Sequence, residues 1–473
     1  MDFRTREKIL DNAIILGGGL TGLTAAYVLE EHDYPACVLE AAPWLGGASR
    51  TVEWKGFRFD LGGHRFYTRK EDVLELVNDL LGDEILRVPR QSRILLNGQF
   101  VNYPLTFFNA LKALGPLTSL AVTGSYVKEK ILNLLREPPD VTFEDWVVSR
   151  FGRRLYEIYF KTYSEKVWGV PCTEMEADFA AQRIRGLSFR EAVKNMITRR
   201  SKTADSLVGE FLYPRLGFGR ICDELAAAVP EERIRTSSPV THVHHDGERV
   251  TGVTTEDEEG EHRLEGPEYL CTYAITDLVR SLDPAPPREV VEAADRLGFR
   301  DIIVLFLGLD IEQVSEDHWI YFPDPDLFFG RVHEPKNWSP AMAPADQTGL
   351  VVEIFCYKEQ PVWEESDERL IQRSADKLEE LGLISASDLI GGTVVRFEKA
   401  YPLYEAGYGE CLETIHGFLD GLENLQLAGR NALFRYTSGD RYIEMGMKAA
   451  HNILGRGNHD LHEVATEQEY AEK

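Results

Sequence analysis

Three glycines between an apolar run and an Ala/Leu-rich run constrain the fold of this chain more than any other feature. Gly17, Gly19 and Gly22 follow the run AIIL, and Glu40 ends the next apolar run about 20 residues further on. In such a turn the first glycine permits a tight bend, the second lets a pyrophosphate approach the backbone, and the third lets helix and strand pack closely. The helix N-terminus then faces the phosphate charge, and the acid accepts hydrogen bonds from ribose hydroxyls. We therefore predict a β-α-β unit that binds a dinucleotide, the alternative being a turn whose glycines serve packing alone.

The length of 473 residues exceeds what one hydrophobic core usually organises, so several structural units are expected. Helical patterns fill the stretch from Pro104 to about Asp205, whereas β-branched runs such as IIVLFLGL and GLVVEIF lie between Asp301 and Tyr404. We therefore predict an α/β fold with a Rossmann-like dinucleotide-binding domain over residues 8–75, 214–275 and 418–457, a helical substrate domain over 104–205, a second mixed or antiparallel sheet over 76–103 and 276–417, and a flexible tail over 458–473.

The net charge of -26, from 52 basic and 78 acidic residues, opposes a broad nucleic-acid or anionic-membrane surface. Six scattered cysteines without a CxxC pair favour a reducing, cytoplasmic setting, and no apolar secretory signal precedes the first predicted strand. The most apolar stretch, from Ala113 to Val127, is too short to span a bilayer. We predict a buried helix pair there, with membrane-surface contact as the alternative. His242, His244 and His245 share a predicted strand with no cysteine at ligand spacing, so we expect solvent-facing residues and no metal site.

Two further segments resemble the amine-oxidase-like FAD superfamily. The first holds Gly46, Gly47, Arg50 and the run FRFDLGGHRF, and the second, near the C-terminus, reads LAGRNALFRYTSGDRYIEMG. The resemblance implies FAD, a Rossmann-like domain of the amine-oxidase type, and a fold that brings both ends of the chain to one cofactor. Beyond the turn glycines and Glu40, it implies cofactor contacts from Gly46, Gly47, Arg50, Gly62, Gly63, Val240, Gly429, Arg430, Asp440 and Met445.

Within that superfamily the chain resembles the UDP-galactopyranose mutase family from about Ile14 to Leu454. The segments that carry the resemblance are GGHRF, NGQFVNYP, FEDWVVSRFG, YSEKVWGVP, WIYFPDPDLFFGRVHEPKNWSP and FRYTSGD. Guanidinium forks and phenol hydroxyls suit a diphosphate, and the resemblance implies substrate contacts from Tyr103, Tyr163, Trp168, Arg183, Tyr321, Arg331, Tyr401 and Tyr436. It also implies that His64 lies against the flavin, and that His64, Arg183 and Arg331 are the catalytic residues. As alternatives, Tyr163 and Trp168 could be plain core aromatics, and His64 a histidine that only completes a turn.

The resemblance implies a nucleotide-sugar substrate and a pyranose/furanose ring interconversion in which N5 of reduced FAD is the nucleophile. The flavin would then need a reductant, NAD(P)H or a reductase, although the reaction itself transfers no net electrons. The alternative is an FAD-dependent oxidoreductase of the same fold, an amine oxidase, a desaturase or a protoporphyrinogen-oxidase-like enzyme that transfers hydride to the flavin. The set of arginines and tyrosines distinguishes the two, because an oxidase of apolar substrates would not need it. The sugar, the base and the oligomeric state are not indicated.

The sequence departs from the eukaryotic mutase pattern at Val208-Gly209-Glu210, where that branch carries an asparagine. A carboxylate would repel a diphosphate. Either Glu210 points away from the site, or the nucleotide sits differently, or the substrate is another compound.

Overall fold

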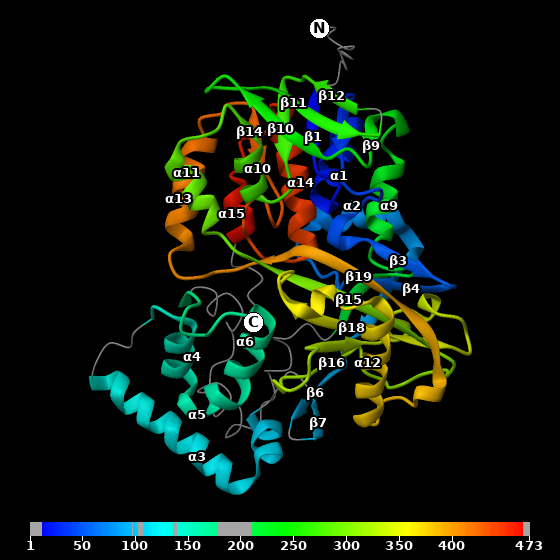
Figure 1. Cartoon of the computed structure of the whole chain (residues 1–473), viewed down its shortest axis with the longest axis vertical. Helices are drawn as coiled ribbons and strands as arrows, with labels where there is room; N and C mark the ends of the chain where they lie inside the picture. Colours follow the sequence, from blue (N-terminus) through cyan, green and yellow to red (C-terminus); the bar gives the residue numbers. More distant parts are fainter. Residues whose placement is uncertain are drawn as a thin grey trace.

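The computed structural model describes residues 12–96, 98–102, 107–135, 140–177, 210–258 and 260–466, and its upper half in Figure 1 is built on a parallel sheet. The strands lie in the order β20, β13, β1, β2 and β9, which run over Leu425–Leu427, Glu268–Cys271, Ala13–Leu16, Ala36–Leu39 and Ile234–Arg235. All neighbours in this sheet are parallel. Its strands come from three distant parts of the chain, so both chain ends meet in one domain.

Both faces of this sheet are covered, which explains why β1 and β2 are apolar throughout. Ala13 and Ile15 belong to one core cluster with the helices α1, α2, α9 and α14, which span Leu20–Glu31, Glu71–Leu81, Arg220–Ala227 and Gly439–Ile453. Ile14 and Leu16 belong to another cluster with α10, α11 and α13, which span Ile275–Ser281, Arg288–Asp295 and Tyr408–Leu419. The glycine turn therefore lies in a three-layered scaffold.

A small second sheet adjoins this domain, in the order β12, β11, β10 and β14, over Gly260–Leu264, Val250–Asp257, Val240–His245 and Leu282–Asp283. β10 and β11 pair antiparallel and form a hairpin across the Asp246-Gly247 turn. The expectation that the strand histidines face solvent is wrong for His245, which is buried beside the Pro284 carbonyl. Residues 276–295 were expected with the later sheet, but β14 pairs with β10, and α10 and α11 share a core cluster with Ile14 and Leu16 of the nucleotide-binding half.

The lower right of Figure 1 holds a seven-stranded mixed sheet. Its order is β19, β15, β18, β17, β16, β6 and β7, over Leu389–Pro402, Phe299–Leu309, Thr348–Cys356, Arg331–His333, Trp319–Tyr321, Ser92–Leu96 and Gln99–Asn102. One face packs on α12, Asp367–Glu380. On the other face, Phe306 stacks on Phe59 of the hairpin β3 and β4, which spans Thr51–Trp54 and Phe57–Asp60. That hairpin links this sheet to the nucleotide-binding half.

The helical layer lies at the lower left of Figure 1 and contains α3, α4, α5 and α6, over Phe107–Leu135, Phe143–Phe151, Arg153–Leu155 and Thr162–Trp168. Thr142 and Asp145 form a capping box that fixes the start of α4. The predicted burial of the apolar stretch in α3 is wrong, because the side chains of Leu117 and Leu120 are exposed to 84% and 72%. In the part of the chain that the structure describes, no helix combines the length and apolar character needed to cross a membrane.

A strand pair and a short helix lie outside the layers described above. Strands β5 and β8, over Ile85–Pro89 and Glu210–Pro214, form an antiparallel pair. The expectation of a frayed tail is wrong for Leu461–Thr466, which forms helix α15 on α14. Leu461 and Val464 are buried there. Residues three apart lie on one face of a helix, so these two form a small apolar face within an otherwise polar segment.

Candidate functional site

The glycine turn has the geometry of a phosphate-binding loop. Gly17 adopts a φ of +113°, and a Cβ on Gly22 would lie 2.1 Å from the Gly17 carbonyl oxygen, so neither position has room for a side chain. By contrast, a Cβ on Gly19 would meet no described atom within 4 Å. The turn is therefore tightly packed at Gly17 and Gly22, whereas the space beside Gly19, at the N-terminus of α1, is free of described protein atoms.

The glycine doublet at Gly46-Gly47 lies against this turn. The N–H of Gly46 donates to the Gly18 carbonyl at 2.8 Å, and Gly46 forms a parallel bridge with Gly19. Gly46 and Gly47 both have positive φ, 90° and 52°. Two glycine segments separated in the sequence therefore bound the same open space.

Glu40 directly follows β2 and holds the turn through hydrogen bonds. One carboxylate oxygen accepts the N–H of Gly18 at 2.8 Å, and the other accepts the N–H of Ala42 at 2.8 Å. Each oxygen retains a second lone pair for a ribose hydroxyl. The Ser238 N–H donates to the Glu40 carbonyl at 2.9 Å, which brings the start of β10, and hence Val240, to the same end of the sheet.

Two buried polar atoms of the expected cofactor residues have no hydrogen-bond partner in the described part of the chain: Nε of Arg50 and Oδ2 of Asp440. The Arg50 guanidinium lies 4.1 Å from the centre of the Trp44 ring, and burial lowers its pKa. Burial also raises the pKa of Asp440, although hydrogen bonds from Ser438 and others oppose the shift. A phosphate for the guanidinium and a hydroxyl for the carboxylate would satisfy both atoms, so these residues fit FAD.

The second part of the site is a row across the seven-stranded sheet. Tyr321 on β16, Arg331 on β17 and Glu353 on β18 are direct cross-strand partners, so their side chains share one face. Nε of Arg331 donates to Glu353 at 2.7 Å, and Nη2 donates to its other oxygen. Glu353 is fully buried, whereas the Arg331 side chain is 20% exposed. The carboxylate thus occupies one edge of the guanidinium and leaves Nη1 for a ligand.

This ion pair stays charged over the physiological range. Burial alone would raise the pKa of Glu353, but the charge and hydrogen bonds of Arg331, together with His333, outweigh it and lower that pKa to about 2. Burial would lower the pKa of Arg331, but Glu353 holds it well above its ordinary value. Glu353 was not predicted from the sequence. The signal was present, since a single acid within the apolar run GLVVEIFC is a buried charge that requires a partner.

Aromatic side chains surround the row. The rings of Tyr163 and Tyr321 are 5.6 Å apart, and Trp168 lies 5.7 Å from Tyr401 and 6.1 Å from Tyr436. Tyr401 and Tyr163 both interact electrostatically with Arg331, so the guanidinium lies near both groups of rings. The structure therefore brings together the substrate residues expected in its described part: Tyr163, Trp168, Tyr321, Arg331, Tyr401 and Tyr436.

The loop that carries Gly62, Gly63 and His64 lies beside this row. A Cβ on Gly63 would sit 3.9 Å from Nη1 of Arg331. Nδ1 of His64 is buried without a hydrogen-bond partner among the described residues. Burial, followed by the charges of Arg430 and Arg331, lowers the pKa of His64 to about 3 against the attraction of Glu353. His64 is therefore neutral near pH 7 and presents an unsatisfied ring nitrogen.

Arg430 is a second cation at this site. It was expected to contact the cofactor, and its side chain is held by hydrogen bonds within the protein. Nε donates to the Tyr442 hydroxyl and Nη1 to the Ala400 carbonyl, each at 2.8 Å. Its guanidinium lies 5.1 Å from the Tyr436 ring. Gly429, with a φ of +92°, turns the chain beside α1. Met445 is fully buried on α14.

Three expectations concern other positions. Arg183 and Tyr103 lie outside the described residues. Glu210 has a side chain that is 60% exposed and pairs with Arg87 at 3.2 Å on the neighbouring strand. Of the alternatives for Glu210, the structure supports the one in which the carboxylate is directed to the surface.

Comparison with known proteins gives relatives of two kinds. A probable UDP-galactopyranose mutase from Klebsiella pneumoniae is 27% identical over 169 residues, 35% of this chain and 43% of its own length. The dTDP-fucopyranose mutase of Escherichia coli is 24% identical over 36% of this chain and 44% of its own length. The coproporphyrinogen III oxidase of Bacillus subtilis is 35% identical over 94 residues, 18% of this chain and 20% of its own length. The matches thus span less than half of each of these relatives.

Solved structures match over nearly the whole chain. A crystal structure of reduced UDP-galactopyranose mutase has a TM-score of 0.84 and 22% identity, covering 98% of this chain and 99% of that one. A putative protoporphyrinogen oxidase from Exiguobacterium has a TM-score of 0.72 and 18% identity, covering 95% and 100%. At these identities the likeness shows the fold. The family model for flavin containing amine oxidoreductases matches residues 20–454. The chain therefore belongs to the flavin containing amine oxidoreductase family and is an FAD-dependent enzyme.

Proposed function

We propose that this enzyme is a nucleotide-sugar mutase that interconverts the pyranose and furanose forms of a sugar linked to a nucleoside diphosphate. The observation that carries the proposal is Arg331, held by the buried Glu353 beside the Gly62–His64 loop and flanked by tyrosines. The mutase relatives and the fold of the reduced mutase support the same class of reaction.

The charge at the site suits a phosphorylated substrate. The Arg331 and Glu353 charges cancel, His64 is neutral, and Arg430 adds one positive charge. Nη1 of Arg331 and the hydroxyls of the surrounding tyrosines are donors, and a diphosphate offers only acceptors. Because the sheet holds the guanidinium in place before substrate arrives, little ordering is needed on binding.

In the proposed reaction FAD, when bound and reduced, supplies a nucleophilic nitrogen for the anomeric carbon. Arg331 binds the diphosphate as the leaving group and stabilises the charge that develops on it. The hydroxyls of Tyr321 and Tyr401 orient the phosphates, and Trp168 excludes water above the sugar. His64 is neutral, so it positions the cofactor loop and does not supply a proton. Arg183, outside the described residues, is proposed as a second phosphate ligand.

An oxidoreductase that transfers hydride to the flavin is the second candidate, because the matching family model describes amine oxidoreductases. The aromatic rings of Trp168, Tyr401 and Tyr436 would suit an apolar or amine substrate. The positive charge of Arg430 beside a neutral ion pair would repel a protonated amine, however. The site therefore favours an anionic substrate.

An anaerobic assay separates the two candidates. Protein reduced with dithionite should interconvert UDP-galactopyranose and UDP-galactofuranose, or the corresponding forms of a dTDP-linked sugar, as followed by chromatography. Oxidised protein should be inactive in the same assay. Turnover of an amine or porphyrinogen substrate, coupled to oxygen consumption and without ring interconversion by the reduced protein, would reject the proposal.

A further inference from the structure

Helix α3 turns its apolar side away from the protein. Of the nine large apolar side chains that are exposed in the described residues, six lie on this helix: Leu117, Leu120, Val127, Ile131, Leu134 and Leu135. Leu117 and Leu134 are exposed to 84% and 86%. Figure 1 shows α3 at the outer edge of the helical layer. Such a concentrated apolar surface is unusual on a monomer and marks an interaction site.

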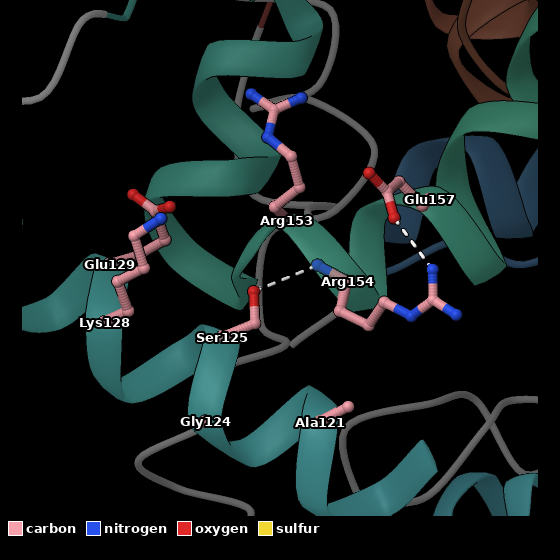
Figure 2. A pocket seen from close by; sticks show the side chains of 8 residues that line it. All are labelled: Ala121, Gly124, Ser125, Lys128, Glu129, Arg153, Arg154 and Glu157. Carbon is pink, nitrogen blue, oxygen red and sulfur yellow. Dashed lines mark hydrogen bonds and ion pairs between the residues drawn. The ribbon is translucent and has the colours of Figure 1, made fainter.

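The orientation of α3 is fixed by polar contacts on its inner side. The Arg154 N–H donates to Oγ of Ser125 at 3.1 Å, an arrangement visible in Figure 2. Nδ2 of Asn133 and Nζ of Lys130 both donate to the Ser149 carbonyl on α4, at 2.8 and 3.3 Å. Rotating the helix to bury its leucines would break these hydrogen bonds. The apolar side therefore faces outward in the folded protein.

Five of these six side chains form a narrow stripe together with the exposed Gly124, and Leu135 lies beside its end. We name this stripe the α3 seam: Leu117, Leu120, Gly124, Val127, Ile131 and Leu134. Their spacings alternate strictly between three and four residues, which is the a/d pattern of a helix that pairs with another helix. A helix that lies on a membrane presents a wider apolar face. The net charge of -26 also opposes an anionic lipid surface.

The α3 seam is symmetric about its own centre, between Ser125 and Tyr126. In an antiparallel pair of identical helices, Leu117 would face Leu134, Leu120 would face Ile131, and Gly124 would face Val127. A twofold interface needs this self-complementarity, since each residue meets a different residue of the same patch. A Cβ on Gly124 would meet no described atom within 4 Å, so the glycine leaves space for the partner valine. Lys128 would approach Thr123 and avoid a like charge.

We propose that two copies of this chain associate through antiparallel pairing of their α3 seams across a twofold axis. The straight part of α3 begins after the kink at Gly115 and runs to Leu135, a length of about 30 Å. One helix pair of this length is a small interface, so the dimer should dissociate on dilution. The proposal does not depend on the reaction that the enzyme catalyses.

The test is sedimentation velocity of the full-length, FAD-loaded protein over a range of concentrations. The wild-type protein should sediment as a dimer at high concentration and as a monomer on dilution. Leu120→Glu and Ile131→Lys should each be monomeric throughout, with the FAD content and thermal unfolding of the wild type. The matched control is Ile390→Glu, since Ile390 is also exposed but lies on β19, and this variant should still dimerise.

The register is tested by mixing the two monomeric variants. Antiparallel pairing places position 120 of one copy against position 131 of the other, so the introduced carboxylate and the introduced ammonium group would meet. The mixture, and the double variant Leu120→Glu/Ile131→Lys alone, should therefore recover the dimer.

A wild-type protein that is monomeric at every concentration would overturn the proposal. Flotation of a monomeric wild-type protein with phosphatidylcholine/phosphatidylglycerol vesicles, lost in Leu120→Glu, would instead identify the seam as a membrane contact. A dimer that survives both single variants would also overturn it.

Discussion

We propose two anion sites in this molecule, the glycine turn and the row of Tyr321, Arg331 and Glu353, which we call the Arg331 row, and they are built differently. The turn at Gly17–Gly22 carries no charge of its own and offers backbone N–H groups, a helix N-terminus and empty space. The row offers a guanidinium whose orientation is fixed by the buried carboxylate of Glu353. In the glycine turn, the shape of the backbone forms the site, and an added side-chain atom would clash or fill the open space. In the Arg331 row, a pair of side chains makes the site, and the loss of either partner leaves a buried charge.

The largest effect is expected in the turn. A Cβ in Gly22→Ala would lie 2.1 Å from the Gly17 carbonyl oxygen, so this variant should misfold or lose bound FAD almost completely. Gly19→Ala is the matched control, because its Cβ meets no described atom. That variant should unfold like the wild-type apoprotein but bind FAD more than about tenfold more weakly. The measurements are thermal unfolding and flavin absorbance. Normal FAD affinity in Gly19→Ala would show that the open space is not the cofactor site.

The next largest effect concerns the row. Glu353→Gln leaves the Arg331 guanidinium without its counter-ion and should lower the free energy of unfolding by about 3–5 kcal/mol. The double variant Arg331→Met/Glu353→Gln removes both charges and should recover most of that loss. Denaturant unfolding of the FAD-loaded proteins measures both values. Equal destabilisation in the single and double variants would show that the two side chains do not act as a pair.

The same contrast explains how much could be predicted from the sequence. The dinucleotide-binding fold could be predicted from Gly17, Gly19, Gly22 and the apolar strands, because residues close together in the sequence determine the geometry of a turn. The substrate aromatics and Arg331 were expected only through resemblance to mutases. The partner Glu353 was missed because it depends on the register between β17 and β18, 22 residues apart in the chain. The outward face of α3 was also missed, since an apolar stretch does not indicate which way it will face.

A smaller effect is expected at His64, which lies on the loop beside the Arg331 row. Its pKa falls from 6.5 to about 3 on folding, so only the unfolded chain binds this proton between those values. Stability should therefore decrease as the pH falls through this range, by up to about 1.4 kcal/mol per pH unit from this residue. Denaturant unfolding of the wild type and His64→Asn at several pH values should show that difference in slope. Identical slopes would place the ring in solvent.

The smallest effect is expected at the rim of the cofactor site. The half-exposed Trp44 ring lies 4.1 Å from the Arg50 guanidinium, and an exposed cation–π contact contributes about 0.5–1 kcal/mol. Trp44→Ala should therefore weaken FAD binding only about two- to fivefold, and Trp44→Phe less. A loss comparable to that of Gly19→Ala would mean that side chains, and not the backbone, dominate this anion site.

The central claim is that the Arg331 row binds the diphosphate of the substrate. Calorimetric titration of UDP into the dithionite-reduced, FAD-loaded enzyme tests it most directly, comparing the wild type with Arg331→Met/Glu353→Gln. The double variant should keep its FAD and its stability but lose about 1.5–3 kcal/mol of binding free energy, which is more than a tenfold weaker Kd. Unchanged UDP affinity in this variant would contradict the account.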